Sequence, residues 1–190
     1  MTIIRRLKLL APLAALSLAG CGLNSVPTAE ENVNAKWGNL QSEYQRRSDL
    51  IPNLVETVKG YAAHERGTLE AVVQARNAAV TAQAGGVAAQ AAAENVLSGA
   101  LRQLFALSEA YPDLKANQNF QQLQTELSDI ENKIAAARRF FNNAVQEYNT
   151  GIQQFPAVLM AGALGFTQKE FFDVGVDERK VLEQAPQVKF

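Results

Sequence analysis

The sequence predicts an all-α protein: an antiparallel up-down four-helix bundle with two long and two short helices, followed by an irregular C-terminal tail. Three observations lead to this prediction. Alanine and glutamine are abundant, and runs of alternating β-branched residues are missing, which favours helix over strand. Two long stretches carry apolar side chains at helical spacing. Glycine and proline divide the chain between these stretches into shorter pieces, and 190 residues that are 47% hydrophobic suffice for one domain with a core.

The first long helix is predicted from about residue 30 to residue 60. Large side chains follow one another there at alternating steps of four and three, which places them on one face. They are Val33, Trp37, Leu40, Tyr44, Arg47, Ile51, Leu54, Val58 and Tyr61. Pro52 interrupts this stretch and costs about 3 kcal/mol in a helix interior. Because the stripe keeps its phase across Pro52, one kinked helix is expected.

Two short helices are predicted next. A turn near residues 60–67 precedes the first of them, with Thr68 as its candidate N-cap, and Gly85–Gly86 ends it. Its apolar side is formed by Leu69, Val72, Val73, Ala79 and Val80. The second short helix runs from about residue 89 to residue 111, before Pro112. Its inward face is predicted to contain Ala93, Leu97, Ala100, Leu104, Leu107 and Tyr111. In the alternative arrangement the first two helices are continuous, which leaves a bundle of three.

The fourth helix has the most regular pattern. One core position recurs every seven residues, at Phe120, Leu127, Ile134, Phe141, Tyr148 and Phe155. The other is filled by Leu123, Ile130, Ala137 and Ala144. Such heptads predict coiled-coil-like packing of helix against helix. The bundle therefore comprises residues 30–156, and residues 157–190 form an apolar segment and an extended tail.

The first twenty residues are typical of a secretory signal peptide, which is removed. Three basic residues precede an apolar stretch of about ten residues, which is too short to span a bilayer. Leu18-Ala19-Gly20-Cys21 then resembles a lipobox, in which the cysteine thiol receives a diacylglyceryl group and becomes the new N-terminus. Cys21 is the only cysteine in the chain. Residues 21–29 are accordingly predicted to be a lipidated Cys21 and a tether, with the membrane bound through the lipid.

Several stretches together resemble the LemA family of bacterial envelope proteins. The most specific is Ile51-Pro52-Asn53-Leu54-Val55, and others are Val58-Lys59-Gly60-Tyr61-Ala62, Tyr111-Pro112-Asp113-Leu114-Lys115 and Phe155-Pro156. The resemblance implies a helical bundle that faces out of the cytoplasm and brings no catalytic residues with it. Members often carry an N-terminal transmembrane helix, which a lipobox replaces here. The expected location is the periplasmic face of a membrane, and Gly22 after the cysteine resembles lipoproteins sorted to the outer membrane of Gram-negative bacteria.

Arg47 is the unusual member of the first stripe, because it occupies a core position. Its side chain either snorkels to water or forms a buried ion pair that fixes helix register. If the two long helices are antiparallel and residue 30 pairs with about residue 155, Arg47 lies level with Arg138 of the fourth helix. Glu131 lies one heptad further along that helix. Glu131 is therefore the leading partner.

No cofactor, metal site or enzymatic activity is expected. His64 is the only histidine, so the paired ligands of haem and di-iron bundles are missing. Without the three basic residues of the signal peptide, 15 basic residues face 19 acidic ones, a net charge of −4. That balance argues against a nucleic-acid partner.

The sequence favours a scaffold or adaptor at the membrane surface, with an unknown envelope protein as partner. Because the fourth helix returns toward the start of the first, the apolar run of residues 156–166 is expected at the membrane-proximal end. Its large side chains are candidates for contact with a partner or the membrane: Val158, Leu159, Met160, Leu164 and Phe166. They could instead fold back and cap the two long helices, which burial of apolar surface favours slightly. The alternative function is a periplasmic sensor or carrier that binds a small ligand within the bundle near Arg47.

Overall fold

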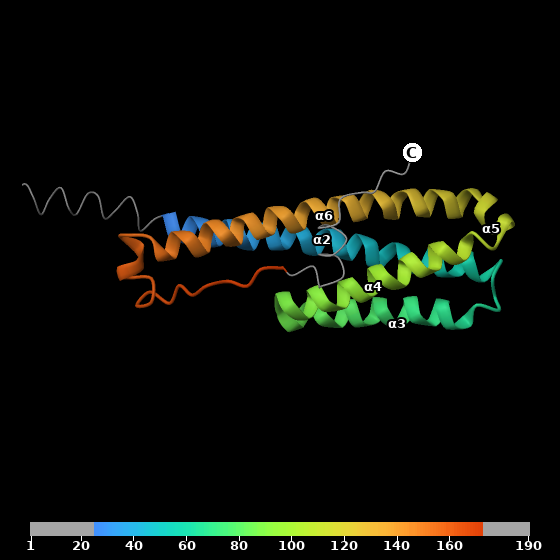
Figure 1. Ribbon diagram of the computed structural model, residues 1–190, viewed down its shortest axis with the longest axis horizontal. Helices are drawn as coiled ribbons and strands as arrows, with labels where there is room; N and C mark the ends of the chain where they lie inside the picture. The colour runs from blue at the N-terminus through green and yellow to red at the C-terminus, as the bar shows by residue number, and fades with distance from the viewer. Residues whose placement is uncertain (1–24, 173–190) are drawn as a thin grey trace, which may run out of the picture. The chain divides into compact units, whose positions relative to one another are not determined.

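The computed structural model describes residues 25–172, so the predicted signal peptide, Cys21 and the end of the predicted tail lie outside the described residues. The described chain is helical, without strands, which confirms the all-α prediction (Figure 1). Its two long helices are α2 (Ser25–Lys59) and α6 (Gln118–Gln153), and its two shorter ones are α3 (Arg66–Ala82) and α4 (Gly86–Ser108). Short elements complete it: η1 (Gln83–Gly85), α5 (Pro112–Ala116) and η2 (Ala157–Leu159). None of the helices in this described part has a stretch long and apolar enough to cross a membrane.

The chain divides into two compact units, and both long helices contribute to each. The helix-pair unit contains residues 25–39 of α2 and residues 139–170. The four-helix unit contains residues 40–138, together with residues 171–172.

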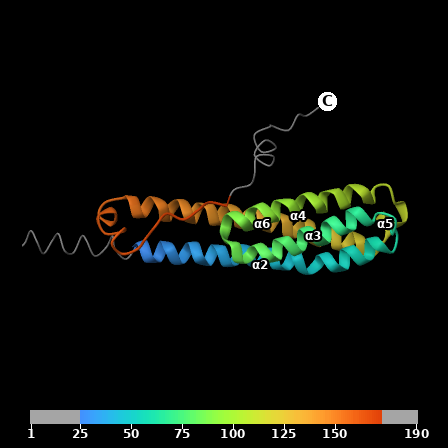
Figure 2. The same cartoon turned by 90° about the horizontal axis from the view of Figure 1, so that it is seen from below.

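In the four-helix unit, contacts between side chains fix the helix directions. Arg138 Nε donates to Tyr44 Oη at 2.9 Å and Asn117 Nδ2 donates to Tyr61 Oη at 2.9 Å, so α2 and α6 are antiparallel. α4 runs parallel to α2, and α3 lies alongside α4 (Figure 2). The core between them is almost entirely aliphatic and includes Ile51, Leu54, Val58, Leu69, Val72, Leu97, Leu104, Leu114, Phe120 and Leu127.

α2 continues through Pro52 without a break. A proline has no N–H, so the carbonyl of Ser48, four residues earlier, loses its partner within the helix. Arg76 of α3 supplies a replacement, because its Nε donates to the Ser48 carbonyl oxygen at 3.0 Å. The defect that the proline creates in α2 is thus repaired by a neighbouring helix.

The turn after α2 separates it from α3, so the alternative of a continuous first and second helix is wrong. The Tyr61 N–H donates to the Val58 carbonyl at 3.0 Å and the Glu65 N–H to that of Ala62 at 3.0 Å. Thr68 as N-cap is also wrong: α3 begins at Arg66, and Glu65 occupies the cap position without a side-chain cap bond. The Glu65 carboxylate instead accepts from Tyr111 Oη at 2.9 Å, which ties the start of α3 to the turn after α4.

α3 also differs from prediction in the face that it buries. Val73 and Val80 are exposed, while Val72, Ala75 and Ala79 are buried with Leu69. The buried residues follow steps of three and four, and Val73 and Val80 lie on the flank of that stripe. The predicted break at Gly85–Gly86 is confirmed, since α3 ends at Ala82 and Gly86 opens α4 with a φ of +87°.

In the helix-pair unit, the Trp37 and Phe141 rings pack at 5.1 Å between centroids. The chain after α6 folds back along this pair. Asn149 makes two 2.9 Å hydrogen bonds to the main chain of Lys169, and Lys169 Nζ lies 2.9 Å from Glu30 Oε1. These contacts hold the segment after α6 against both long helices.

Two boundaries in the helix-pair unit differ from those predicted. α2 begins at Ser25, so the last five residues of the predicted tether are helical. α6 ends at Gln153, because the residue before a proline disfavours helical backbone. Phe155, predicted as a core position, has therefore left the helical face and is 80% exposed, while Ile152 is buried near the end of α6.

Candidate functional site

A buried ion-pair cluster lies within the four-helix unit. Arg47 of α2 is fully buried and donates through Nη2 to Glu94 of α4 and through Nη1 to Glu131 of α6. Its Nη1 also donates to Ser98 Oγ at 2.8 Å. One guanidinium thus joins three helices, and the structure places Glu131, the partner favoured by the sequence, together with two residues that the sequence analysis did not select.

The surroundings of the two carboxylates differ. The Glu94 side chain is 3% exposed, whereas that of Glu131 is 40% exposed. Burial alone would lower the pKa of Arg47, but the charges of Glu131 and Glu94 and their hydrogen bonds outweigh it and raise that pKa. Arg47 therefore stays charged, and snorkelling to water does not describe this side chain.

A signal for Glu94 was present in the sequence. Apart from Ala91, the buried positions of α4 follow alternating steps of four and three: Gln90, Glu94, Leu97, Leu101, Leu104 and Ser108. Glu94 occupies this stripe as Arg47 occupies that of α2. A charged residue on the core stripe of each of two helices predicts a buried pair.

An aromatic and cationic layer lies beside the ion-pair cluster. Tyr44 is buried and accepts from Arg138, whose guanidinium lies 4.7 Å from the centre of the Phe172 ring. Burial raises the pKa of the Tyr44 phenol far above its ordinary value, against the opposing effect of Arg138. Tyr44 is thus held in its neutral form.

A groove of about 370 Å³ opens beside the ion-pair cluster, between α4 and α6. Its lining includes both Ser98 and Glu131, the more exposed partners of Arg47. The remaining lining residues are Leu101, Arg102, Phe105, Gln124, Leu127 and Ser128. This groove gives solvent a path to one carboxylate of the cluster.

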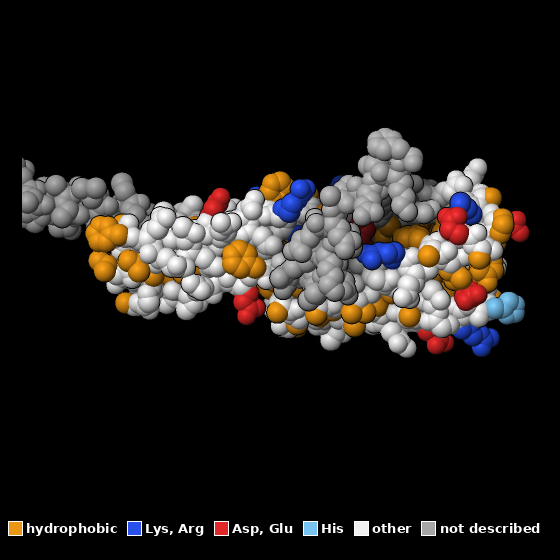
Figure 3. Space-filling view, in the orientation of Figure 1, with side chains coloured by type: hydrophobic (Ala, Val, Ile, Leu, Met, Phe, Trp, Pro, Cys, Tyr) orange, Lys and Arg blue, Asp and Glu red, His pale blue; other side chains and the backbone are white. Residues whose placement is uncertain are grey.

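The apolar segment after α6 is exposed in the helix-pair unit. Val158, Leu159, Met160 and Leu164 are 44–73% exposed, and hydrophobic side chains gather on the surface at this end of the unit (Figure 3). Phe166 is partly buried. The prediction that these five residues fold back as a cap is wrong for the four exposed ones, because the small side chains of Ala157 and Ala161 fill the buried positions instead.

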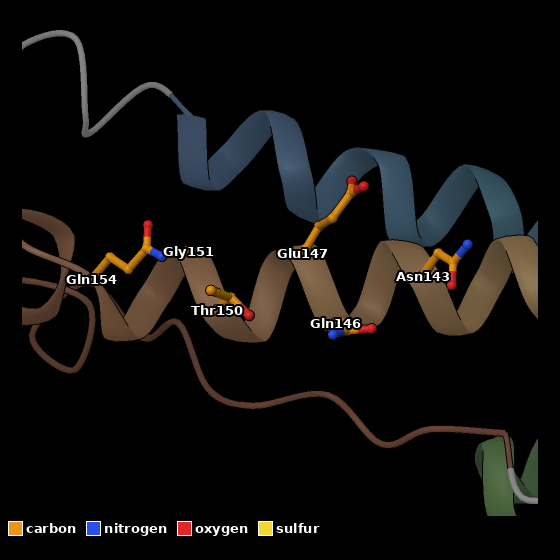
Figure 4. A pocket seen from close by; sticks show the side chains of 6 residues that line it. All are labelled: Asn143, Gln146, Glu147, Thr150, Gly151 and Gln154. Atoms are coloured by element: carbon orange, nitrogen blue, oxygen red, sulfur yellow. The ribbon is translucent and has the colours of Figure 1, made fainter.

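A second hollow, of about 470 Å³, follows the outer face of α6 in the helix-pair unit. Its lining residues come from successive turns of this helix and from the residue that follows it: Asn143, Gln146, Glu147, Thr150, Gly151 and Gln154 (Figure 4). They are exposed or partly exposed amide, hydroxyl and glycine positions with a single carboxylate. Such a set is typical of a solvated helix face.

His64 lies exposed in the turn between α2 and α3. Within residues 25–172, no group of three or more His, Cys, Asp or Glu side chains is arranged to hold a metal ion.

Comparison with known proteins places this chain in a family. The sequence pattern of the LemA family matches residues 36–190. Magnetosome protein MamQ of Magnetospirillum gryphiswaldense is 28% identical over 173 residues, covering 78% of this chain and 64% of the relative. Protein LemA of Metamycoplasma hominis is 27% identical over 142 residues, covering 74% of this chain and 64% of the relative. The chain thus spans less than two thirds of the length of these relatives. Because the family pattern covers most of the chain, the chain belongs to the LemA family.

Proposed function

We propose that this chain is a non-enzymatic, lipid-anchored envelope protein that acts as a scaffold or adaptor on the periplasmic face of a membrane. Membership of the LemA family and similarity to a magnetosome protein support an association with membranes. The lipobox that ends at Cys21 supports the anchor.

The observation that carries the proposal is the position of the exposed apolar segment. α2 and α6 are antiparallel in the helix-pair unit, so the chain that follows α6 lies beside the first turns of α2 (Figures 1 and 2). Cys21 precedes Ser25 by four residues, which span at most about 14 Å even when fully extended. A lipid on Cys21 would therefore hold the apolar segment close to the membrane surface.

The chemistry of the segment suits such a surface. Phe155 and Leu159 are 80% and 73% exposed. Burying one large apolar side chain in a membrane or a partner contributes about 1.5–3 kcal/mol. Several exposed side chains in one segment therefore supply a second contact beside the lipid, and this contact orients the protein on the surface.

Fluorescence of single labelled cysteines tests this orientation. The acylated chain is placed in liposomes with an environment-sensitive dye at Leu159→Cys or, as control, at Phe140→Cys. Phe140 is also an exposed apolar residue of the helix-pair unit, 59% exposed, but it lies about 20 Å along α6 from the end of that helix at Gln153. We expect quenchers attached to lipid to reach the dye at position 159 and not at position 140.

Equal quenching at both positions, in liposomes and in native membranes, would contradict the proposed contact. Quenching at position 159 that needs only lipid favours a membrane contact. Protection of position 159 that arises only in native membranes favours a protein partner.

The alternative function, a sensor or carrier of a small ligand, is favoured by one observation. The groove between α4 and α6 reaches Glu131 beside Arg47, where that function requires a polar-lined cavity. A scaffold role does not need this groove, so the two functions can be tested separately.

A further inference from the structure

We propose that the groove between α4 and α6 binds a small amphiphilic cation, an ammonium group carried on a short apolar body. The groove volume of about 370 Å³ lies at the lower end of the range for small-molecule sites. Apolar walls are supplied by Leu101, Phe105 and Leu127, and polar groups by Ser98 and Glu131. The site belongs to the four-helix unit and is independent of the membrane contact proposed above.

The charge of the ion-pair cluster determines the sign of the ligand. One guanidinium, Arg47, faces two carboxylates, Glu94 and Glu131, so the cluster carries a net charge of −1. Glu94 is buried with Arg47 and is balanced by it. The surplus negative charge therefore resides on Glu131, which gives Oε1 to Arg47 and is 40% exposed. A cation that enters the groove meets this surplus beside low-dielectric walls, where charges attract more strongly than in water.

Arg102 also lines the groove and provides an opposing charge. It projects from α4 one turn after Ser98 and is exposed to solvent. Its positive charge repels an ammonium group, so its removal strengthens the binding of a cation and weakens that of an anion. Removal of the Glu131 charge and removal of the Arg102 charge should therefore change the affinity for the same cation in opposite directions.

Titration of the full chain with three six-carbon probes tests the proposal: hexylammonium, 1-hexanol and hexanoate. We expect hexylammonium to bind with a dissociation constant of about 1 mM, equivalent to roughly 4 kcal/mol, and the other two at least about tenfold more weakly. Backbone NMR shifts of Ser98, Leu101 and Leu127 should move along a saturable curve. Equal binding of hexanol and hexylammonium would overturn the proposal, since it would show an apolar groove without charge selection.

Two variants locate the charge selection. Glu131→Gln should weaken hexylammonium binding by about tenfold, because it removes the surplus charge. Arg102→Gln should strengthen it by about threefold, by relief of repulsion across the groove. Circular dichroism and the melting temperature show whether Glu131→Gln retains the fold. If this variant unfolds, Arg102→Gln still decides, because Arg102 is exposed and outside the ion-pair cluster. Unchanged or weaker binding by Arg102→Gln would contradict the proposed site.

Discussion

Replacement of Arg47 by alanine tests how far the ion-pair cluster stabilises the four-helix unit. The guanidinium is fully buried and joins Glu94, 3% exposed, to Glu131, 40% exposed. Without Arg47, water can reach Glu131 but not Glu94, which remains a buried charge without a cation. Loss of one partner of a buried ion pair costs about 3–5 kcal/mol, and a domain of this size is stable by about 5–15 kcal/mol. We therefore expect a folded variant that has lost a large part of its stability.

Urea unfolding of the full chain, followed by helical circular dichroism, measures this loss. With a slope of about 2 kcal/mol per molar urea, the midpoint should fall by about 1.5–2.5 M. The matched control is Arg46→Ala, which removes an exposed arginine one residue earlier and should change stability by less than about 0.5 kcal/mol. A loss as small for Arg47→Ala as for Arg46→Ala would refute the reasoning.

A double variant separates charge from packing. Arg47→Met with Glu94→Leu removes both buried charges and fills their space with apolar side chains of similar length. Such replacements are often neutral or stabilising. The double variant should thus be clearly more stable than Arg47→Ala. If it is equally unstable, the uncompensated Glu94 carboxylate does not cause the loss of stability in Arg47→Ala.

Three further predictions concern the anchor, the backbone and alkaline pH. Cys21→Ser should abolish incorporation of labelled lipid and release the protein or leave its precursor unprocessed; unchanged attachment and processing would disprove the anchor. Gly86→Ala should lower the melting temperature at a cost of about 1–3 kcal/mol, because Gly86 has a φ of +87°. Gly99→Ala, where an added Cβ meets nothing within 4 Å, should instead stabilise by about 0.5–1 kcal/mol; shifts of the same sign would contradict this pair. Burial raises the pKa of Tyr44, and the hydrogen bond to Glu65 raises the pKa of Tyr111. Above about pH 10 the unfolded chain therefore loses these two protons before the folded chain does. The free energy of unfolding should fall as the pH rises further. In an alkaline titration, tyrosinate absorbance should rise as helical circular dichroism is lost, and full ionisation of a folded protein near pH 10 would contradict this.

Periodicity predicted the long helices because their core stripes continue for many turns. The same stripe identified Arg47, since a charged residue at a core position is visible without a structure. Glu94 was missed because the predicted inward face of its helix, which includes Ala93 and Leu97, contained only alanine, leucine and tyrosine, although Glu94 follows the same spacing as the buried positions. The contact of Arg47 with Glu131 differs by about two turns from the pairing estimated from the helix ends, and that of Tyr44 with Arg138 by about one turn. The register of α2 against α6 depends on how side chains of both helices pack, and the spacing of residues within one helix does not determine it.

Local rules failed at the start of α3 and in the segment after α6. Thr68 satisfies the composition of an N-cap, but the bond between Glu65 and Tyr111 joins residues 46 positions apart, which no local pattern reveals. Hydrophobicity slightly favoured burial of the large side chains after Pro156 over their exposure to a membrane or a partner. The structure instead buries the small Ala157 and Ala161, so hydrophobicity without a partner surface did not predict burial in this segment.

Pro52 of α2 influences the register in which α3 packs against α2. Pro52 leaves the Ser48 carbonyl without a hydrogen-bond donor in α2. Arg76 can donate to this carbonyl only when α3 packs against α2 in a single register and orientation. In a hairpin that had slipped by a turn, this carbonyl would be left without a hydrogen bond, at a penalty of about 1–3 kcal/mol if buried. The proline therefore discriminates against misaligned pairings of these helices. Positions 52 and 76 should accordingly change together during evolution, because a chain that loses the arginine gains by restoring a backbone N–H in α2.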